Sequence, residues 1–216
     1  MTTRADAPLP PPLLHVVEDD EPTRKATARL LTAAGFDVRT YASPSDLLAA
    51  PDSGRPGCII LDVRLPGQSG LDLQVALAAR EEPLPIIFLT GHAEIPDSVR
   101  AIQRGAVDFL TKPVEGAILL EAVSRALVKN VEDRARRTRR RSLRDRYERL
   151  TTRERQVFAH LISGQLNKQV AADLSISERT IKLHRARILE KLEVDSMAAL
   201  ARFAVDLGID PVPGNR

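Results

Sequence analysis

The stretch CIILDVRLPGQSGLDL, residues 58–73, decides the fold of this chain. Its first four residues are all apolar, which is typical of a strand buried on both faces of a sheet. A loop containing Pro66 and Gly67 follows, and residues 69–81 then have the pattern of a helix. A buried strand that leads into a helix is the repeating unit of a parallel α/β sheet.

The same alternation continues on both sides of this stretch. Short segments of strand-like sequence predict further strands at residues 13–17, 37–41, 85–89 and 106–110. Helical patterns predict helices at residues 21–34, 43–50, 96–104 and from about residue 115 onward. Five strands alternating with five helices in about 120 residues predict an α/β fold with a five-stranded, doubly wound parallel sheet.

Composition narrows the class of protein. The 216 residues are 43% hydrophobic and 28% charged, which is ordinary for a globular protein with room for two small domains. Cys58 is the only cysteine, so no internal disulfide can form and a reducing compartment is expected. No apolar run reaches the ~20 residues of a membrane span, and the proline-rich residues 1–12 lack a signal-peptide core. We therefore expect a cytoplasmic protein with a flexible tail at residues 1–12 and no membrane contact.

Charge is distributed unevenly along the chain. Residues 1–127 contain 12 Lys and Arg against 17 Asp and Glu, a formal charge of −5. Residues 128–216 contain 20 against 12, a formal charge of +8. This asymmetry indicates two modules with different partners, and the basic module is the candidate for binding a polyanion.

The basic half contains four short helical patterns, at residues 152–162, 167–174, 177–193 and 196–207. The second and third are separated by a tight connection, which predicts a helix–turn–helix. The outward face of this pair is basic and slender enough for the major groove of double-stranded DNA. The candidate contact residues are Lys168, Gln169, Arg179, Thr180, Lys182, Leu183 and Arg187.

Between the two halves lies an arginine-rich segment, residues 129–149. Nine arginines fall within residues 134–149. The segment has no Pro or Gly, so it is expected to form a helical linker. A solvated linker, a contact with phosphate groups and a support for dimerisation are all compatible with this pattern.

Polar residues lie at or just after the ends of the strands predicted in the first half of the chain. Acidic residues 18–21 follow the first strand and Asp62 follows the third, while Thr90 ends the fourth and Lys112 lies beyond the fifth. Because the carboxyl ends of parallel strands meet at one edge of a sheet, we expect these groups to converge. Converging carboxylates favour a divalent cation such as Mg²⁺, and a lysine and a hydroxyl beside them suit phosphoryl transfer to an aspartate.

Residues 13–121 resemble the receiver domain of two-component response regulators. The matching stretches are VVEDDEPTR (16–24), IILDVRLPGQSGLDL (59–73), FLTGHAEIP (88–96) and GAVDFLTKP (105–113). The resemblance implies a flavodoxin-like fold in which Asp62 is the phosphoacceptor. It also implies that Asp19, Asp62 and the backbone carbonyl of Arg64 bind Mg²⁺, with Glu18 acting largely through water.

The resemblance assigns roles to three further residues. Thr90 and Lys112 match the hydroxyl and the lysine that contact the phosphoryl group, and Phe109 matches an aromatic switch residue that turns inward when the hydroxyl engages phosphate. Arg64 and His92 match positions that flank the path of the hydrolytic water. We therefore expect substitutions of Arg64 or His92 to change the lifetime of the phosphorylated form.

Residues 150–207 resemble the LuxR-type DNA-binding domain, on the pattern LTTRERQVFAHLISGQLNKQVAADLSISERTIKLHRARILEKL (150–192). Both halves together resemble a FixJ/NarL-type response regulator. The implied domains are a receiver at residues 13–128, a linker at 129–149 and an all-α, four-helix DNA-binding domain at 150–210. The implied partners are a sensor histidine kinase, double-stranded DNA, a second copy when phosphorylated, and RNA polymerase.

Two alternatives remain at this point. A haloacid-dehalogenase-like phosphatase also uses an aspartate after an apolar strand, but it needs a second aspartate two positions later, where this chain has Arg64. A phosphorylation-independent DNA-binding regulator with a vestigial receiver is disfavoured by the intact polar set at the strand ends. We expect a transcription regulator rather than an enzyme.

Overall fold

The computed structural model describes residues 11–51, 53–91 and 95–212, so His92 and most of the predicted tail lie outside the described residues. The chain divides into two units, residues 1–134 and 135–216. Each unit has its own hydrophobic core. None of the helices formed by the described residues is long and apolar enough to span a bilayer.

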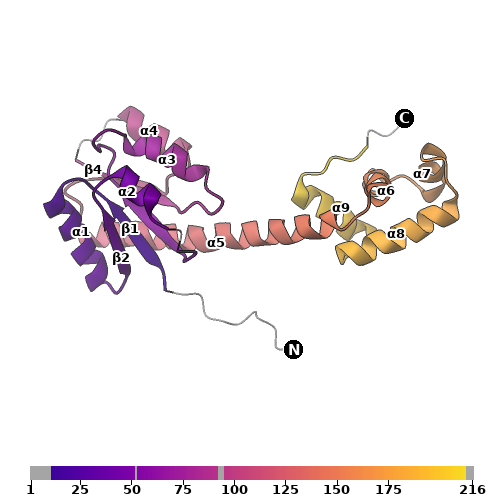
Figure 1. The fold of residues 1–216 in the computed structure, drawn as a ribbon, viewed down its shortest axis with the longest axis horizontal. Coiled ribbons are helices and arrows are strands. Elements are labelled where there is room, and N and C mark those ends of the chain that lie inside the picture. The colour runs from indigo at the N-terminus through magenta and orange to yellow at the C-terminus, as the bar shows by residue number, and fades with distance from the viewer. Residues whose placement is uncertain (1–10, 52, 92–94, 213–216) are drawn as a thin grey trace. The chain divides into compact units, whose positions relative to one another are not determined.

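The first unit is built on a five-stranded parallel sheet with the order β2-β1-β3-β4-β5 (Figure 1). The strands are β1 (Leu13–Val17), β2 (Asp37–Tyr41), β3 (Gly57–Leu61), β4 (Ile86–Thr90) and β5 (Asp108–Thr111). The helices between them are α1 (Glu21–Ala33), α2 (Pro44–Ala49), α3 (Gly70–Ala78) and α4 (Ile95–Gln103). Helix α5 (Gly116–Glu148) follows β5. This order confirms the predicted doubly wound, flavodoxin-like fold.

Helices cover both faces of the sheet, as the apolar strands require. On one face, Leu14, Cys58 and Ile60 pack against α1 and α5. On the other face, Ile59, Leu61 and Phe88 pack against α2, α3 and α4. Burial raises the pKa of the Cys58 thiol to about 12, so it is a packing residue rather than a reactive one.

Several predicted element ends are wrong by a few residues, and hydrogen bonding explains two of them. Strand β4 begins at Ile86 rather than residue 85, because Pro85 has no N–H to donate to the ladder. Strand β5 begins at Asp108 rather than residue 106, because the N–H of Ala106 donates to the Ala101 carbonyl at 3.0 Å and closes α4 instead.

Helix α3 is shorter than predicted, since it ends at Ala78 and not at residue 81. The N–H of Arg80 bonds to the Leu77 carbonyl three residues back, which tightens the chain into a turn before Pro83. The bounds predicted for β1, β2 and the helix at residues 152–162 match the structure, and the remaining helix and strand ends differ from the predictions by at most one residue.

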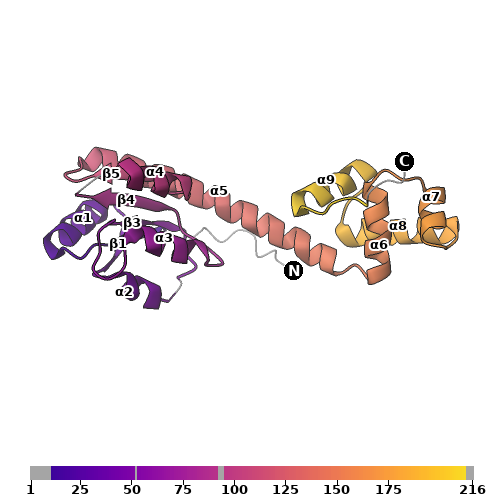
Figure 2. The same ribbon diagram turned by 90° about the horizontal axis from the view of Figure 1, so that it is seen from above.

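The second unit contains α6 (Thr152–Ile162), α7 (Asn167–Asp173), α8 (Glu178–Leu192) and α9 (Met197–Leu207) (Figure 2). A capping box opens α6, in which the side chains of Thr151 and Glu154 each accept a hydrogen bond from the other residue's backbone N–H. One core joins all four helices, and its fully buried members include Phe158, Val170, Ile181 and Leu200.

Helix α5 is continuous over 33 residues and confirms the predicted helical linker. Its first part belongs to the first unit, where the Asn130 Oδ1 accepts a hydrogen bond from the N–H of Gly57 at 3.2 Å. Its last part belongs to the second unit, where Leu143 is buried in the core.

Candidate functional site

Three carboxylates converge at the carboxyl edge of the sheet. Glu18 and Asp19 follow β1 and Asp62 follows β3, and within the described residues their oxygens lie within 4.8 Å of one another. The backbone holds this edge together, because the N–H of Asp62 donates to the Val17 carbonyl at 3.0 Å. Glu18 and Asp62 are buried, whereas Asp19 is exposed. The predicted convergence of strand ends is therefore present in the structure.

Lys112 carries the positive charge that balances this cluster. Its Nζ donates a hydrogen bond to Glu18 Oε2 and another to Asp62 Oδ2, the latter at 2.6 Å. Its backbone N–H donates to the carbonyl of Thr90 at 2.8 Å, which ties the end of β5 to the end of β4. One ammonium group thus bridges the first and third strand ends.

Burial and the ion pairs oppose each other at this cluster. Burial raises the pKa of Glu18, and the negative charge of Asp62 adds to that effect against the opposing hydrogen bond from Lys112. Burial alone would lower the pKa of Lys112, but its hydrogen bonds to Asp62 and Glu18 and their charges outweigh burial and raise it. Lys112 is therefore a charged donor at neutral pH.

The loop after Asp62 is held close to the carboxylate. The N–H of Arg64 donates to Asp62 Oδ1 at 3.0 Å, and the N–H of Gly70 donates to the Val63 carbonyl at 2.8 Å. A Cβ atom on Gly70 would lie 2.2 Å from the carbonyl oxygen of Asp62, which no real contact permits. Only glycine therefore allows α3 to begin this close to Asp62.

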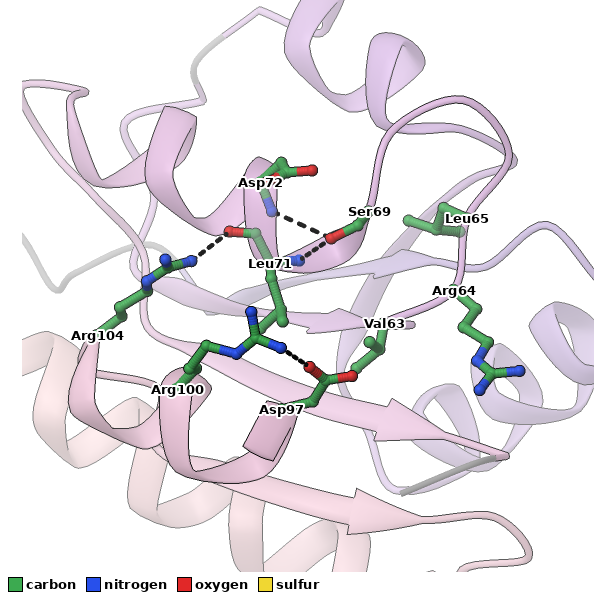
Figure 3. A pocket seen from close by; sticks show the side chains of 9 residues that line it. All are labelled: Val63, Arg64, Leu65, Ser69, Leu71, Asp72, Asp97, Arg100 and Arg104. Atoms are coloured by element: carbon green, nitrogen blue, oxygen red, sulfur yellow. Dashed lines mark hydrogen bonds and ion pairs between the residues drawn. The ribbon is translucent and has the colours of Figure 1, made fainter. Parts of the chain in front are cut away.

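A pocket of about 510 Å³ opens between this loop and α4 (Figure 3). Arg100 pairs with Asp97 at 2.6 Å, and Ser69 caps α3 by accepting from the N–H of Leu71 at 3.1 Å. In Figure 3 the side chain of Arg64 lies at the far end of the view from Arg104. Arg64 is exposed at the rim of this pocket, which is compatible with its predicted influence on solvent access.

Thr90 and Phe109 lie on neighbouring strands. Thr90 is fully buried at the end of β4. Phe109 pairs in register with Phe88, and the two ring centroids are 5.8 Å apart. Phe109 is only partly buried and packs against the core formed with α3 and α4. The ring therefore lies beside the strand that ends in Thr90, and its role as a switch stays a prediction.

The four acidic residues 18–21 that follow β1 have different partners, and only Glu18 and Asp19 belong to the carboxylate cluster. Asp20 caps α1, because its Oδ2 accepts from the N–H of Thr23 at 2.9 Å, and Glu21 pairs with Lys25 on the same helix. Arg24 was not predicted from the sequence as part of this site, and its Nη1 donates to the carbonyls of Glu18 and Asp19 at 2.7 and 3.0 Å. Its place in the first turn of α1, which directs it back to the preceding loop, is the signal that could have found it.

The carboxylate cluster fits a magnesium ion. Mg²⁺ binds oxygen at about 2.0–2.1 Å in an octahedron and accepts one or two carboxylates with water and phosphate oxygens completing the shell. The oxygens of Glu18, Asp19 and Asp62 are close enough to share one ion after small side-chain rotations. The assignment of Glu18, Asp19, Asp62 and the carbonyl of Arg64 as metal ligands stays a prediction.

In the second unit, the predicted DNA-contact residues fall on α7 and α8. Thr180 is partly buried. The other six residues are exposed, namely Lys168, Gln169, Arg179, Lys182, Leu183 and Arg187. The opposite face of α8, with Ile181, Ile188 and Leu192, is fully buried. Gln169 also has a structural task, because its Oε1 accepts from the N–H of Leu166 at 2.8 Å and caps α7.

Two domain families match this chain. The response regulator receiver domain matches residues 14–124, and the luxR family of bacterial regulatory proteins matches residues 148–204. The chain belongs to the two-component response regulators that join a receiver domain to a LuxR-type DNA-binding domain. It acts on transcription rather than as a classical enzyme, and the predicted FixJ/NarL-type resemblance is confirmed.

Similar proteins cover nearly the whole chain. The response regulator protein TodT of Pseudomonas putida is 41% identical over 190 residues, which are 88% of this chain and 84% of that protein. The transcriptional regulatory protein FixJ of Rhizobium meliloti is 38% identical over 198 residues, 92% of this chain and 97% of that protein. The solved structure of the response regulator StyR is 41% identical, covers 91% of this chain and 99% of its own, and has a TM-score of 0.75.

Membership in this family carries general properties. Receiver domains bind Mg²⁺ at an acidic pocket, and this chain has an acidic cluster at the corresponding edge of the sheet. A receiver domain implies a sensor kinase as partner, and a LuxR-type domain implies binding to DNA.

Proposed function

We propose that this cytoplasmic protein accepts a phosphoryl group on Asp62 from a sensor histidine kinase and thereby controls DNA binding by residues 150–210. The observation that carries the proposal is the bridge from Lys112 to both Glu18 and Asp62. It supplies a buried aspartate with a fixed cation at the position where a phosphoryl group would arrive.

The chemical step forms one bond and breaks one. An oxygen of Asp62 attacks the phosphorus of the kinase's phosphohistidine, the P–N bond breaks, and its electron pair returns to the imidazole. The product is an acyl phosphate on Asp62. Glu18, Asp19, Asp62 and the carbonyl of Arg64 would hold Mg²⁺, which when bound neutralises charge on the carboxylates and on the phosphoryl oxygens.

The protein's own groups then respond to the new charge. Lys112 is already beside Asp62 Oδ2 and pairs with a phosphoryl oxygen, while the hydroxyl of Thr90 donates to another. Movement of Thr90 frees space that the ring of Phe109 occupies, and the surface formed by α4 and β5 changes shape. This change favours a dimer, whose two LuxR-type domains bind half-sites about one helical turn apart and place the protein beside RNA polymerase.

The test measures phosphorylation and assembly together. Wild type, Asp62→Asn and the control Asp72→Asn are incubated with acetyl phosphate and Mg²⁺, and intact mass and light-scattering mass are recorded. Wild type and the control are expected to gain one phosphoryl group and to double in mass, whereas Asp62→Asn does neither.

Other outcomes have definite meanings. Phosphorylation without a change in light-scattering mass removes dimerisation and leaves release of the DNA-binding domain as the response. Absence of phosphoryl groups from all three proteins contradicts the proposal and favours a phosphorylation-independent regulator.

A further inference from the structure

The arginine-rich part of α5 has one anchored face. Arg139 pairs with Asp206 at 3.0 Å, and Arg146 donates to the carbonyl of Leu192 at 3.1 Å. Arg149 pairs with Glu193 at 3.5 Å, and Leu143 lies between these contacts in the buried core. These residues explain why this stretch of α5 packs on the second unit, and they account for only part of its charge.

A second face of the same helix groups four arginines, and the contacts within the second unit engage only part of this set. Arg137, Arg140, Arg141 and Arg144 follow the spacing i, i+3, i+4, i+7 and therefore lie on one side of α5, the α5 arginine face. Arg140 and Arg144 are exposed and make no hydrogen bond or ion pair within the described ranges. Four cations are thus grouped where the fold of the second unit does not use most of them.

Arg137 provides an independent observation. Its Nε and Nη2 atoms are buried, yet among the residues described they have no hydrogen-bond partner. Covering guanidinium donors without an acceptor costs free energy, so such donors are normally satisfied. A rotation of this side chain toward an anion on the α5 arginine face would supply the missing acceptor.

Charge selects the kind of partner. Residues 134–149 contain nine arginines against two acids, Asp145 and Glu148, so a second copy of this helix would place like charges against each other. The four arginines extend over about 10 Å of helix, at 1.5 Å per residue. One strand of B-DNA presents about three phosphates over that length, at one per 3.4 Å.

We propose that the α5 arginine face binds backbone phosphates of the same double-stranded DNA that the helix–turn–helix contacts. The proposal rests on DNA binding by the second unit, which contains both surfaces. The arginines add affinity and salt dependence without reading base sequence, because phosphate contacts carry no sequence information.

The test uses the full-length protein and a labelled random-sequence duplex of about four helical turns, roughly 40 base pairs. Fluorescence anisotropy gives the dissociation constant over a series of salt concentrations. The test variant is Arg137→Gln with Arg140→Gln and Arg144→Gln, since glutamine keeps helix propensity and removes charge. The matched control removes the same charge elsewhere, at three exposed arginines of α1, β2 and α9: Arg29→Gln, Arg39→Gln and Arg202→Gln.

The quantity compared is the slope of the logarithm of the DNA association constant against the logarithm of the salt concentration. In the test variant the magnitude of this slope is expected to fall by about 2–3, at about 0.9 per lost phosphate contact. The control and a triple Arg→Lys variant at the test positions keep the wild-type slope. Equal slopes in wild type and test variant, or an equal fall in test and control variants, overturn the proposal. The proposal is also overturned if the test variant loses binding to phosphatidylserine vesicles while its DNA binding is unchanged, because that result assigns the α5 arginine face to a lipid surface.

A separate variant distinguishes failure of this inference from failure of the proposed function. Lys182→Ala with Arg187→Ala changes the helix–turn–helix alone. If this variant loses DNA binding and the α5 variant does not, only the inference fails. If wild type itself does not bind any duplex, the DNA-binding function fails with it.

Discussion

At the residue scale, Glu154 is a buried carboxylate of the second unit that bonds to two separate segments of it. Its Oε2 accepts from Lys191 Nζ at 2.7 Å and from the N–H of Thr151 at 2.8 Å. Burial would raise the pKa of Glu154, but these hydrogen bonds and the charge of Lys191 outweigh burial and lower it below its ordinary 4.5. One side chain therefore joins the start of α6 to the end of α8.

The stability of the second unit should depend on pH through this residue. Because the folded state lowers the pKa of Glu154, the ionised carboxylate stabilises the fold above pH 4.5, and this stabilisation is lost as pH falls through the folded pKa. Glu154→Gln is expected to reduce the free energy of unfolding by about 1–2 kcal/mol at pH 7 and by much less in stronger acid. Hydrogen exchange of peptides from residues 150–210 measures this loss of stability at each pH.

The control for this prediction is Glu190→Gln, an exposed change on α8 that should have little effect at either pH. A pH-independent loss of stability in Glu154→Gln would mean that packing, rather than ionisation, is responsible.

Magnesium should stabilise the receiver domain through the carboxylate cluster. At a concentration one hundred times the dissociation constant, mass action adds about 2.7 kcal/mol to the free energy of unfolding. Asp19→Asn is expected to shrink this gain, whereas Asp20→Asn, which retains a helix-capping side chain, keeps it. Thermal unfolding with Mg²⁺ and then with EDTA is the measurement. An equal gain in both variants would contradict the assignment of Asp19.

At the element scale, the start of α3 is fixed by its approach to the end of β3. Gly70 leaves no room for a Cβ atom beside the Asp62 carbonyl, and its backbone is not in the left-handed region, so the constraint is purely one of space. Any side chain there must push α3 away from the strand or move the loop that carries Arg64.

Gly70→Ala should therefore lower both stability and phosphorylation. The expected loss is about 1–3 kcal/mol in free energy of unfolding, as for other overpacked sites, with slower phosphorylation by acetyl phosphate. Gly91→Ala is the matched control, because a Cβ atom there meets nothing within 4 Å. Urea unfolding and intact mass over time report the two effects. A Gly70→Ala protein phosphorylated at the wild-type rate would show that the loop adapts.

The sequence predicted the order of elements and the residues of the carboxylate cluster, because apolar runs and strand-end positions are local patterns. Strand-end positions alone did not separate Glu18 and Asp19 from Asp20 and Glu21, and only the family resemblance did, because Asp20 and Glu21 are directed away from the cluster by contacts within the first turns of α1. It also missed Arg24 and the contact of Gly70, because both depend on distances between segments that sequence spacing does not record.

At the scale of the whole molecule, the two cores share no buried residues, so they should respond independently to core mutations. Phe158→Leu is expected to destabilise the second unit by about 1–3 kcal/mol and to leave the magnesium-dependent gain of the receiver unchanged. Phe88→Leu, at an equally buried site, should do the reverse.

Hydrogen exchange resolved by peptide separates these two responses. Loss of protection in both units from either substitution would show that they unfold as one cooperative block.

Cys58 makes such experiments on the intact chain unusually direct. The chain has this single thiol, and its burial with a pKa of about 12 leaves almost no thiolate to react with a maleimide at neutral pH. Cysteines introduced at exposed positions in each unit, such as Val75 and Val205, would therefore accept fluorophores without background labelling of the native protein. Energy transfer between the two dyes would then follow the distance between receiver and DNA-binding domain while acetyl phosphate is added.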